Sequence, residues 1–186
     1  MSKLTDFRVA VLATDGFEET ELTEPVKALK GAGAQVTILS LGPGQIQGVR
    51  HDLDKTVKVK VDRAIRDVST EEFDAVHLPG GTMNADSMRM VPKVQAFLKE
   101  MQDAGKPLAA ICHAPWELVS AGLVRGRTLT SYHTIQDDIR NASGNWVDQE
   151  VVEDGNWVTS RQPGDLPAFN RAMLALFSRS LAPNRR

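Results

Sequence analysis

Short apolar segments alternate along this chain with segments whose apolar residues recur at helical spacing. Residues 7–13 (FRVAVLA) and 107–112 (PLAAIC) are almost entirely apolar, as expected of strands buried on both faces of a sheet. Between such segments, residues 20–32 and 91–104 place their apolar side chains on one face of a helix. Strands and helices that alternate in this way form a mainly parallel sheet with helices on both faces. The pattern therefore predicts an α/β fold of three layers.

The alternation continues without a linker, a repeat or a low-complexity segment, so we expect residues 1–186 to form a single domain. The 22 Lys and Arg residues nearly balance the 24 Asp and Glu residues, and the formal net charge is -2. A chain of this charge is not expected to bind nucleic acid or an anionic membrane surface. Its apolar runs are too short to span a bilayer and no signal sequence is recognisable, so we expect a cytoplasmic protein.

The single cysteine, Cys112, lies where one of the buried strands is predicted to end. Ligands of open parallel sheets bind at the carboxyl ends of the strands, which makes this thiol a candidate site residue. Ala110 and Ala114 flank it, and Pro115 follows in a position suited to a first helical turn. Small neighbours at this spacing permit a tight turn like the nucleophile elbow of hydrolases. Because a helix N-terminus lowers the pKa of a thiol, we expect a thiolate in an open pocket; the alternative is an inert, buried cysteine.

Two other strand ends carry groups that can act with this thiol. Gly80 and Gly81 follow the apolar segment 73–78 and leave backbone N–H groups uncovered, either in an oxyanion hole or in an ordinary turn. Glu18 and Glu21 follow the first strand, either as solvated charges at the start of a helix or as carboxyl groups pressed against the thiol. In the second case, desolvation raises the pKa of the carboxyl group and allows it to donate a proton to sulfur.

Metal and nucleotide signals are weak in this chain. One cysteine and four histidines show no metal-binding spacing. The glycine-rich segments 31–33 and 42–48 lack either the position or the spacing of a dinucleotide-binding fingerprint. We therefore expect neither a metal nor a cofactor.

Four segments together resemble one known family. They are residues 15–21 (DGFEETE), 78–81 (LPGG), 110–116 (AICHAPW) and 158–166 (VTSRQPGDL). In this order and at these strand ends they are similar to the PfpI family, a branch of the class I glutamine amidotransferase-like superfamily that includes intracellular proteases, general stress proteins and deglycases. The resemblance covers nearly the whole chain, and it implies a flavodoxin-like form of the three-layer fold.

The resemblance implies a role for each candidate residue. It implies that Cys112 is the nucleophile, that Glu21 hydrogen-bonds the cysteine and that Glu18 is a second acid of the pocket. His113 matches the histidine of the family's Cys-His pair, and Asp86 takes the position of an acid that a neighbouring subunit contributes. The pocket and the oxyanion hole would be completed by Gly80, Gly81, Tyr132 and Trp116, together with the backbone of His113.

The chain departs from the family's pattern at two of these positions. Ala114 stands where the family usually has glycine, and we expect its methyl group to narrow the pocket without removing the tight turn. Asp86 is shorter than the Glu of some members, which shortens its reach to His113.

The resemblance implies a cysteine-dependent stress-response enzyme that acts on reactive dicarbonyls or glycated adducts, as a glutathione-independent glyoxalase or as a deglycase. Alternatives are an intracellular peptidase with a Cys112–His113–Asp86 triad formed between subunits, and a redox sensor or chaperone whose Cys112 is oxidised. A binding domain with an inert thiol is a further alternative. The expected partners are other copies of the chain, in a homodimer or homohexamer, and a small dicarbonyl, glycated or peptide substrate.

Overall fold

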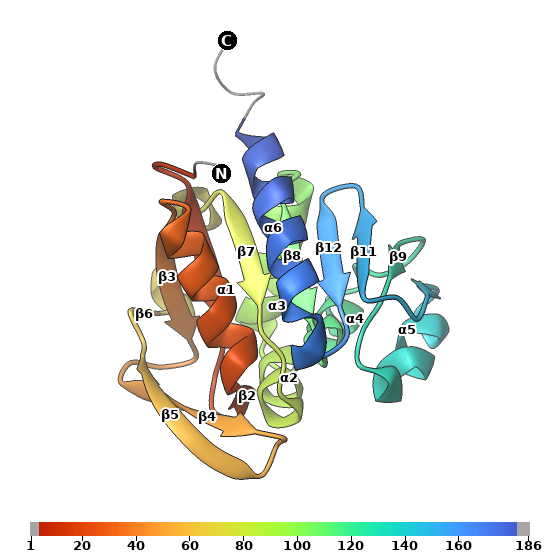
Figure 1. The fold of residues 1–186 in the computed structure, drawn as a ribbon, viewed down its shortest axis with the longest axis horizontal. Helices are drawn as coiled ribbons and strands as arrows, with labels where there is room; N and C mark the ends of the chain where they lie inside the picture. The colour runs from red at the N-terminus through yellow and green to blue at the C-terminus, as the bar shows by residue number, and fades with distance from the viewer. Residues whose placement is uncertain (1–3, 182–186) are drawn as a thin grey trace.

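A seven-stranded sheet forms the centre of the molecule (Figure 1). The computed structural model describes residues 4–181. Neighbouring strands are parallel except at one edge, where β11 is antiparallel to β12. In spatial order the strands are β11 (Val151–Asp154), β12 (Trp157–Ser160), β8 (Leu108–Ile111), β7 (Ala75–Leu78), β1 (Arg8–Leu12), β3 (Gln35–Ser40) and β6 (Arg63–Ala64).

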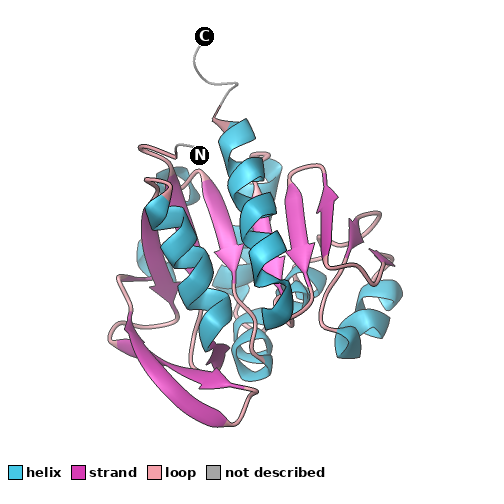
Figure 2. Cartoon of the chain, in the orientation of Figure 1, coloured by secondary structure: helices cyan, strands magenta, loops and turns pink. Residues whose placement is uncertain are grey.

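Helices cover both faces of this sheet, as the sequence predicts (Figure 2). On one face, α1 (Glu19–Gly31) and α6 (Leu166–Ser180) lie side by side. On the other face, α3 (Pro92–Asp103) packs with α2 (Thr82–Arg89) and α4 (Pro115–Ser120). No helix within residues 4–181 combines the length and the apolar composition of a bilayer-spanning segment.

Alternate residues of the central strands enter two separate hydrophobic cores. In β1, Val9 and Val11 pack in the core beneath α1 and α6, whereas Ala10 and Leu12 pack in the core beneath α3. Both faces of the strand are therefore buried, which explains its continuous apolar sequence. Each fully buried side chain of valine or leucine size stabilises the fold by about 1.5–3 kcal/mol.

Two smaller sheets lie beside the central one. β2 (Phe17–Glu18), β4 (Gln45–Arg50) and β5 (Asp54–Lys60) form a three-stranded sheet in which β4 and β5 are an antiparallel hairpin. β9 (Thr128–Leu129) and β10 (Asn145–Trp146) pair next to α5 (Gln136–Asn141). The 3₁₀ helices are η1 (Ile65–Asp67), η2 (Thr70–Glu72), η3 (His133–Ile135) and η4 (Pro163–Asp165).

Three local differences from the sequence pattern have physical reasons. β4 lies in a glycine-rich segment, where Gly48 allows close contact because a Cβ there would come 2.9 Å from the ring of Phe17. α2 buries only three of its eight residues, so its sequence shows too few apolar positions to predict a helix. Of the segment 128–132, only Thr128 and Leu129 form a strand, and this strand pairs with β10 outside the central sheet.

Glu117 in α4 is an acidic side chain inside the protein. It is fully buried, and neither carboxyl oxygen has a hydrogen-bond partner within residues 4–181. Burial raises its pKa well above the ordinary value of 4.5. The folded chain therefore keeps a proton that the unfolded chain releases. As a result, the free energy of unfolding falls as the pH rises above about 4.5.

Glu117→Leu is expected to stabilise the protein, because it replaces a buried, unpartnered acid with an apolar side chain of similar volume. At neutral pH the gain in the free energy of unfolding is about 1–3 kcal/mol. The gain is smaller near pH ~4, where the unfolded chain also holds the proton. Urea unfolding at the two pH values measures both gains, and Glu24→Leu on the exposed face of α1 is the control. Equal gains at the two pH values, or a loss at neutral pH, would contradict this account.

Candidate active site

Three segments that follow parallel strands meet at one edge of the central sheet. Cys112 follows β8, Gly80 follows β7, and Glu21 lies in the first turn of α1, beyond β1 and β2. A Cβ atom placed on Gly80 would lie 2.5 Å from the Cβ of Cys112 and would overlap the carboxyl group of Glu21. The structure therefore brings these three predicted residues into contact.

Cys112 occupies a strained turn between β8 and α4. Its φ of 63° lies in the left-handed region, which costs a non-glycine residue about 1–2 kcal/mol. The Cys112 N–H donates a hydrogen bond to the Ser160 carbonyl at 3.1 Å, and the Cys112 carbonyl accepts one from the Tyr132 N–H at 2.8 Å. These bonds hold the conformation. The geometry agrees with the tight turn that Ala110 and Ala114 predict.

The two glycines let the backbone approach the thiol. Gly81 has a φ of 94°, and a Cβ there would overlap the backbone of Gly16. The backbone N–H groups of Gly81 and His113 face the sulfur of Cys112 and lower the pKa of its thiol. The family resemblance implies that these backbone groups form an oxyanion hole, and this role stays a prediction.

Glu21 is fully buried beside the thiol. Its Oε2 accepts a hydrogen bond from the Gly80 N–H at 3.0 Å, whereas Oε1 is buried and has no partner by distance and angle within residues 4–181. Burial raises the pKa of Glu21 well above its ordinary value, and the charge of Glu18 raises it further. The carboxyl group is therefore protonated at neutral pH, and Cys112 is the side chain that it faces.

The thiol of Cys112 is more enclosed than the sequence suggests. The residue is only 7% exposed, and burial raises the pKa of the thiol; an ionised Glu21 would raise it further. The backbone N–H donors lower this pKa without offsetting burial. The expectation of a thiolate in an open pocket is therefore wrong, because the six-residue helix α4 does not compensate for desolvation. The sulfur needs a base to take its proton.

His113 lies where such a base is needed. Its Nδ1 is 3.2 Å from the sulfur of Cys112. Burial lowers the pKa of His113, while the charge of Asp52 raises it. The imidazole is therefore uncharged at neutral pH and can accept the thiol proton at Nδ1. On the opposite side of the ring, Nε2 lies 3.1 Å from the Thr134 hydroxyl and 3.4 Å from the Thr82 hydroxyl.

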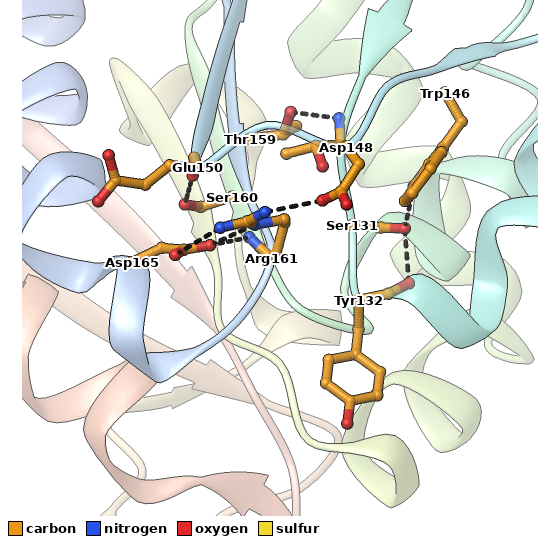
Figure 3. Close-up of polar contacts among 10 residues, drawn as sticks. Ser131, Tyr132, Trp146, Asp148, Glu150, Thr159, Ser160, Arg161 and Asp165 are labelled. Atoms are coloured by element: carbon orange, nitrogen blue, oxygen red, sulfur yellow. Dashed lines mark hydrogen bonds and ion pairs between the residues drawn. The ribbon is translucent and has the colours of Figure 1, made fainter.

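Two aromatic residues pack against the imidazole of His113. Tyr132 stacks on it with ring centres 4.9 Å apart, and Trp116 lies 5.8 Å away. Figure 3 shows how Tyr132 is fixed: the Trp146 indole N–H donates to the Ser131 hydroxyl, which donates to the Tyr132 carbonyl, both at 2.9 Å. The two rings restrict the motion of His113. The role in the substrate pocket that the family resemblance implies for Tyr132 and Trp116 stays a prediction.

Ion pairs of Arg161 fix the segment that follows β12 (Figure 3). Its guanidinium group lies 2.9 Å from a carboxylate oxygen of Asp165 and 2.7 Å from one of Asp148. This explains the 158–166 motif structurally, because the motif includes Ser160, whose carbonyl anchors Cys112. A cavity of about 220 Å³ opens here and is lined by Tyr132, His133, Asp148, Arg161 and Gln162.

The other two predicted acids lie in different surroundings. Glu18 is mostly buried and accepts a hydrogen bond from the His51 N–H at 2.9 Å, and burial raises its pKa. Asp86 is exposed on α2, and within residues 4–181 it makes no hydrogen bond or ion pair with His113. Its role as an acid supplied by a neighbouring subunit stays a prediction.

Three polar residues near His113 are absent from the sequence prediction. Thr134 lies two residues after Tyr132, so its place next to a predicted site residue was the one available signal. Asp52 and Thr82 gave no signal, because they lie in the β4–β5 turn and at the start of α2, two elements that the pattern did not reveal. The part of the chain that the structure describes contains no cluster of three His, Cys, Asp or Glu side chains suited to a metal ion.

Known proteins similar to this chain identify its family. The model of the DJ-1/PfpI family matches residues 7–176. The chain belongs to the DJ-1/PfpI family. Among its relatives, Deglycase TK1284 of Thermococcus kodakarensis is 45% identical over 169 residues, which are 91% of this chain and 98% of the relative. The Putative cysteine protease YraA of Bacillus subtilis is 43% identical over 169 residues, with 91% and 97% of the two chains covered.

A solved structure of the DJ-1/PfpI family has the same fold. DJ-1beta of Drosophila melanogaster superposes with a TM-score of 0.85 at 31% identity, over 94% of this chain and 91% of that one. The resemblance to the PfpI family and the expected three-layer, flavodoxin-like fold are thereby confirmed.

Gly80→Ala is expected to destabilise the folded chain, because the added Cβ meets both the Cys112 side chain and the Glu21 carboxyl group. Overpacking of this kind lowers the free energy of unfolding by about 1–3 kcal/mol. Gly31→Ala is the matched control, since a Cβ at this helical position has no atom within 4 Å. Urea unfolding compares the two variants, and equal stabilities would show that the site tolerates a side chain at residue 80.

Proposed function

We propose that this DJ-1/PfpI protein is a deglycase-type enzyme in which Cys112 attacks small α-dicarbonyls and the adducts that they form with amino and thiol groups. One observation carries the proposal: the sulfur of Cys112 lies between an acid and a base. Glu21, protonated by burial, faces it on one side, and His113 Nδ1 lies 3.2 Å away. Addition of a thiol to a carbonyl requires a base for the thiol proton and an acid for the carbonyl oxygen.

The first step adds the sulfur of Cys112 to the aldehyde carbon of the substrate. The C–S bond forms while the thiol proton passes to His113 Nδ1 and Glu21 protonates the carbonyl oxygen. The backbone N–H groups of Gly81 and His113 stabilise the charge that develops on this oxygen. A free dicarbonyl gives a hemithioacetal. With a glycated amine, the C–S bond replaces the C–N bond and Glu21 protonates the leaving nitrogen, so that Glu21 is again left as a carboxylate while His113 keeps the thiol proton.

The second step converts the hemithioacetal into a thioester. The Glu21 carboxylate, now without its proton, removes the hydrogen of the carbon bonded to sulfur and returns it to the neighbouring carbonyl carbon. The hydroxyl proton moves to the neighbouring oxygen. One carbon is oxidised while the other is reduced, so no external oxidant or reductant is consumed. Water then hydrolyses the thioester, releases a 2-hydroxy acid and restores the Cys112 thiol.

The enclosure of Cys112 favours a small substrate. The residue is only 7% exposed. A thiol with so little exposed surface is reached more easily by a substrate of a few carbon atoms than by an extended peptide. The name of the relative Deglycase TK1284 supports the same class of reaction.

Cys112→Ala is expected to abolish the release of 2-hydroxy acid and free amine from the methylglyoxal adduct of N-acetylarginine, without added metal or glutathione. Glu21→Gln, which cannot release a proton, is expected to lower the rate by about 100-fold. Glu24→Gln, on the exposed face of the same helix, is the control and retains the wild-type rate. NMR follows the adduct and both products directly.

The assay also separates the reactions that the family resemblance allows. The adduct releases dicarbonyl spontaneously, so a deglycase must consume it faster than this uncatalysed release. A rate that never exceeds the spontaneous release assigns the activity to free dicarbonyls and contradicts deglycation. Full activity in Cys112→Ala would contradict the proposed mechanism altogether.

The name of YraA favours peptide hydrolysis as a second candidate function. It would use Cys112 and His113 with Asp86 from another copy of the chain, and therefore requires an oligomer. Cleavage of a peptide panel by the wild type but not by Asp86→Asn, combined with light scattering, tests this candidate. A redox sensor would instead gain oxygen at Cys112 under low peroxide without turning over either kind of substrate.

A further inference from the structure

His113 can accept a proton from Cys112 only if its Nδ1 carries none. A neutral imidazole has one proton, so Nδ1 is free when that proton is on Nε2. Nε2 faces the hydroxyl groups of Thr134, at 3.1 Å, and of Thr82, at 3.4 Å. A hydroxyl group can either donate or accept, so these two contacts alone do not determine which nitrogen is protonated.

Asp52 determines the direction of the Thr82 hydroxyl. Its Oδ1 accepts a hydrogen bond from the Thr82 N–H at 2.9 Å, and its Oδ2 accepts one from the Thr82 hydroxyl at 2.7 Å. An ionised carboxylate has no hydrogen to donate, so the Thr82 hydroxyl must donate to Asp52. Its lone pairs are then left to accept the Nε2–H of His113. This direction leaves Nδ1 bare beside the sulfur.

We propose that Asp52 and Thr82 are positioning residues that hold the proton of His113 on Nε2, so that one chain contains the acid that supports its Cys-His pair. The inference deepens the proposed function and rests on it, because it takes His113 to be the base. It differs from the expectation that a neighbouring subunit supplies this acid through Asp86.

The β4–β5 turn places these polar groups beside the site. His51 and Asp52 have φ values of 53° and 62°, the two positive values of a tight hairpin turn that the Leu53 N–H closes on the Arg50 carbonyl. The polar groups of this turn bind the site on two sides. The His51 N–H donates to Glu18, next to the acid side of the thiol, and Asp52 binds Thr82 on the histidine side.

Other groups around His113 contribute to its titration but do not replace Asp52. From η3, the charge of His133 lowers the pKa of His113, while Asp52 raises it. Tyr132 and Trp116 contribute ring faces, and Cys112 contributes its sulfur. A variant that changes only Asp52 leaves all of these groups in place, so its effect on His113 can be measured separately.

Two substitutions separate this role from a purely structural one. Asp52 also accepts a hydrogen bond from the first N–H of α2, so its loss could act by destabilising that helix alone. Thr82→Val keeps that N–H bond and removes only the hydroxyl group. Asp52→Asn keeps one acceptor oxygen but turns an NH2 group toward one of the two Thr82 donors. Asp54→Asn, exposed on the same hairpin, is the control.

In the deglycation assay, Asp52→Asn and Thr82→Val are each expected to lower kcat about tenfold with little change in KM, a small share of the ~10²–10⁴ that a positioned base supplies. The double variant is expected to be no slower than either single one, because both break the same chain of hydrogen bonds. Thr82→Ser and Asp54→Asn are expected to retain the wild-type kcat. In Asp52→Asn, the acid limb of the pH–rate profile moves to lower pH, since the charge that raises the pKa of His113 is gone.

NMR titration of the imidazole nitrogens tests the inference without any substrate. The wild type and Asp54→Asn are expected to show His113 protonated on Nε2, and Asp52→Asn and Thr82→Val to show a larger share of the Nδ1-protonated form. If the spectra are as expected but the wild type shows no deglycase activity, the role of Asp52 is upheld and the proposed function is overturned. An active wild type whose His113 spectrum and kcat are unchanged by Asp52→Asn would overturn the inference. It would also be overturned if Thr134→Val lowered kcat while Asp52→Asn and Thr82→Val did not.

Discussion

The contact between the Cys112 side chain, the Gly80 backbone and the Glu21 carboxyl group is the interaction on which the rest of the site depends. It requires a residue without a Cβ at position 80, because any side chain there would separate the acid from the thiol. It also requires the left-handed backbone of Cys112, which hydrogen bonds to Ser160 and Tyr132 maintain. The central sheet brings the three segments together, since parallel strands have their carboxyl ends at one edge.

Burial at this edge has opposite consequences for the two reacting groups. It raises the pKa of Glu21, which keeps the carboxyl group protonated and makes it an acid at neutral pH. It also raises the pKa of Cys112, which makes the thiol a poor nucleophile until a base removes its proton. His113 meets that need only with its Nδ1 unprotonated, so the polar groups beyond the imidazole matter as much as the thiol itself.

The sequence predicted the groups that follow buried strands and missed those that reach the site from elsewhere. Apolar segments and helical spacing located the central sheet, and small residues around Cys112 predicted its turn. The thiolate expectation was wrong because a helix N-terminus is visible in a sequence, whereas the burial of one side chain is a property of the folded whole. Asp52 and Thr82 were missed because β4 and α2 carry too few apolar residues to reveal where they pack.

The central claim is that one sulfur lies between a protonated acid and a base with a fixed tautomer. Neutron diffraction from a crystal exchanged into heavy water at neutral pH locates these hydrogens directly. The account predicts deuterium on the carboxyl group of Glu21 and on Nε2 of His113. A bare Glu21 carboxylate, or an imidazole with deuterium on Nδ1 alone, would contradict it.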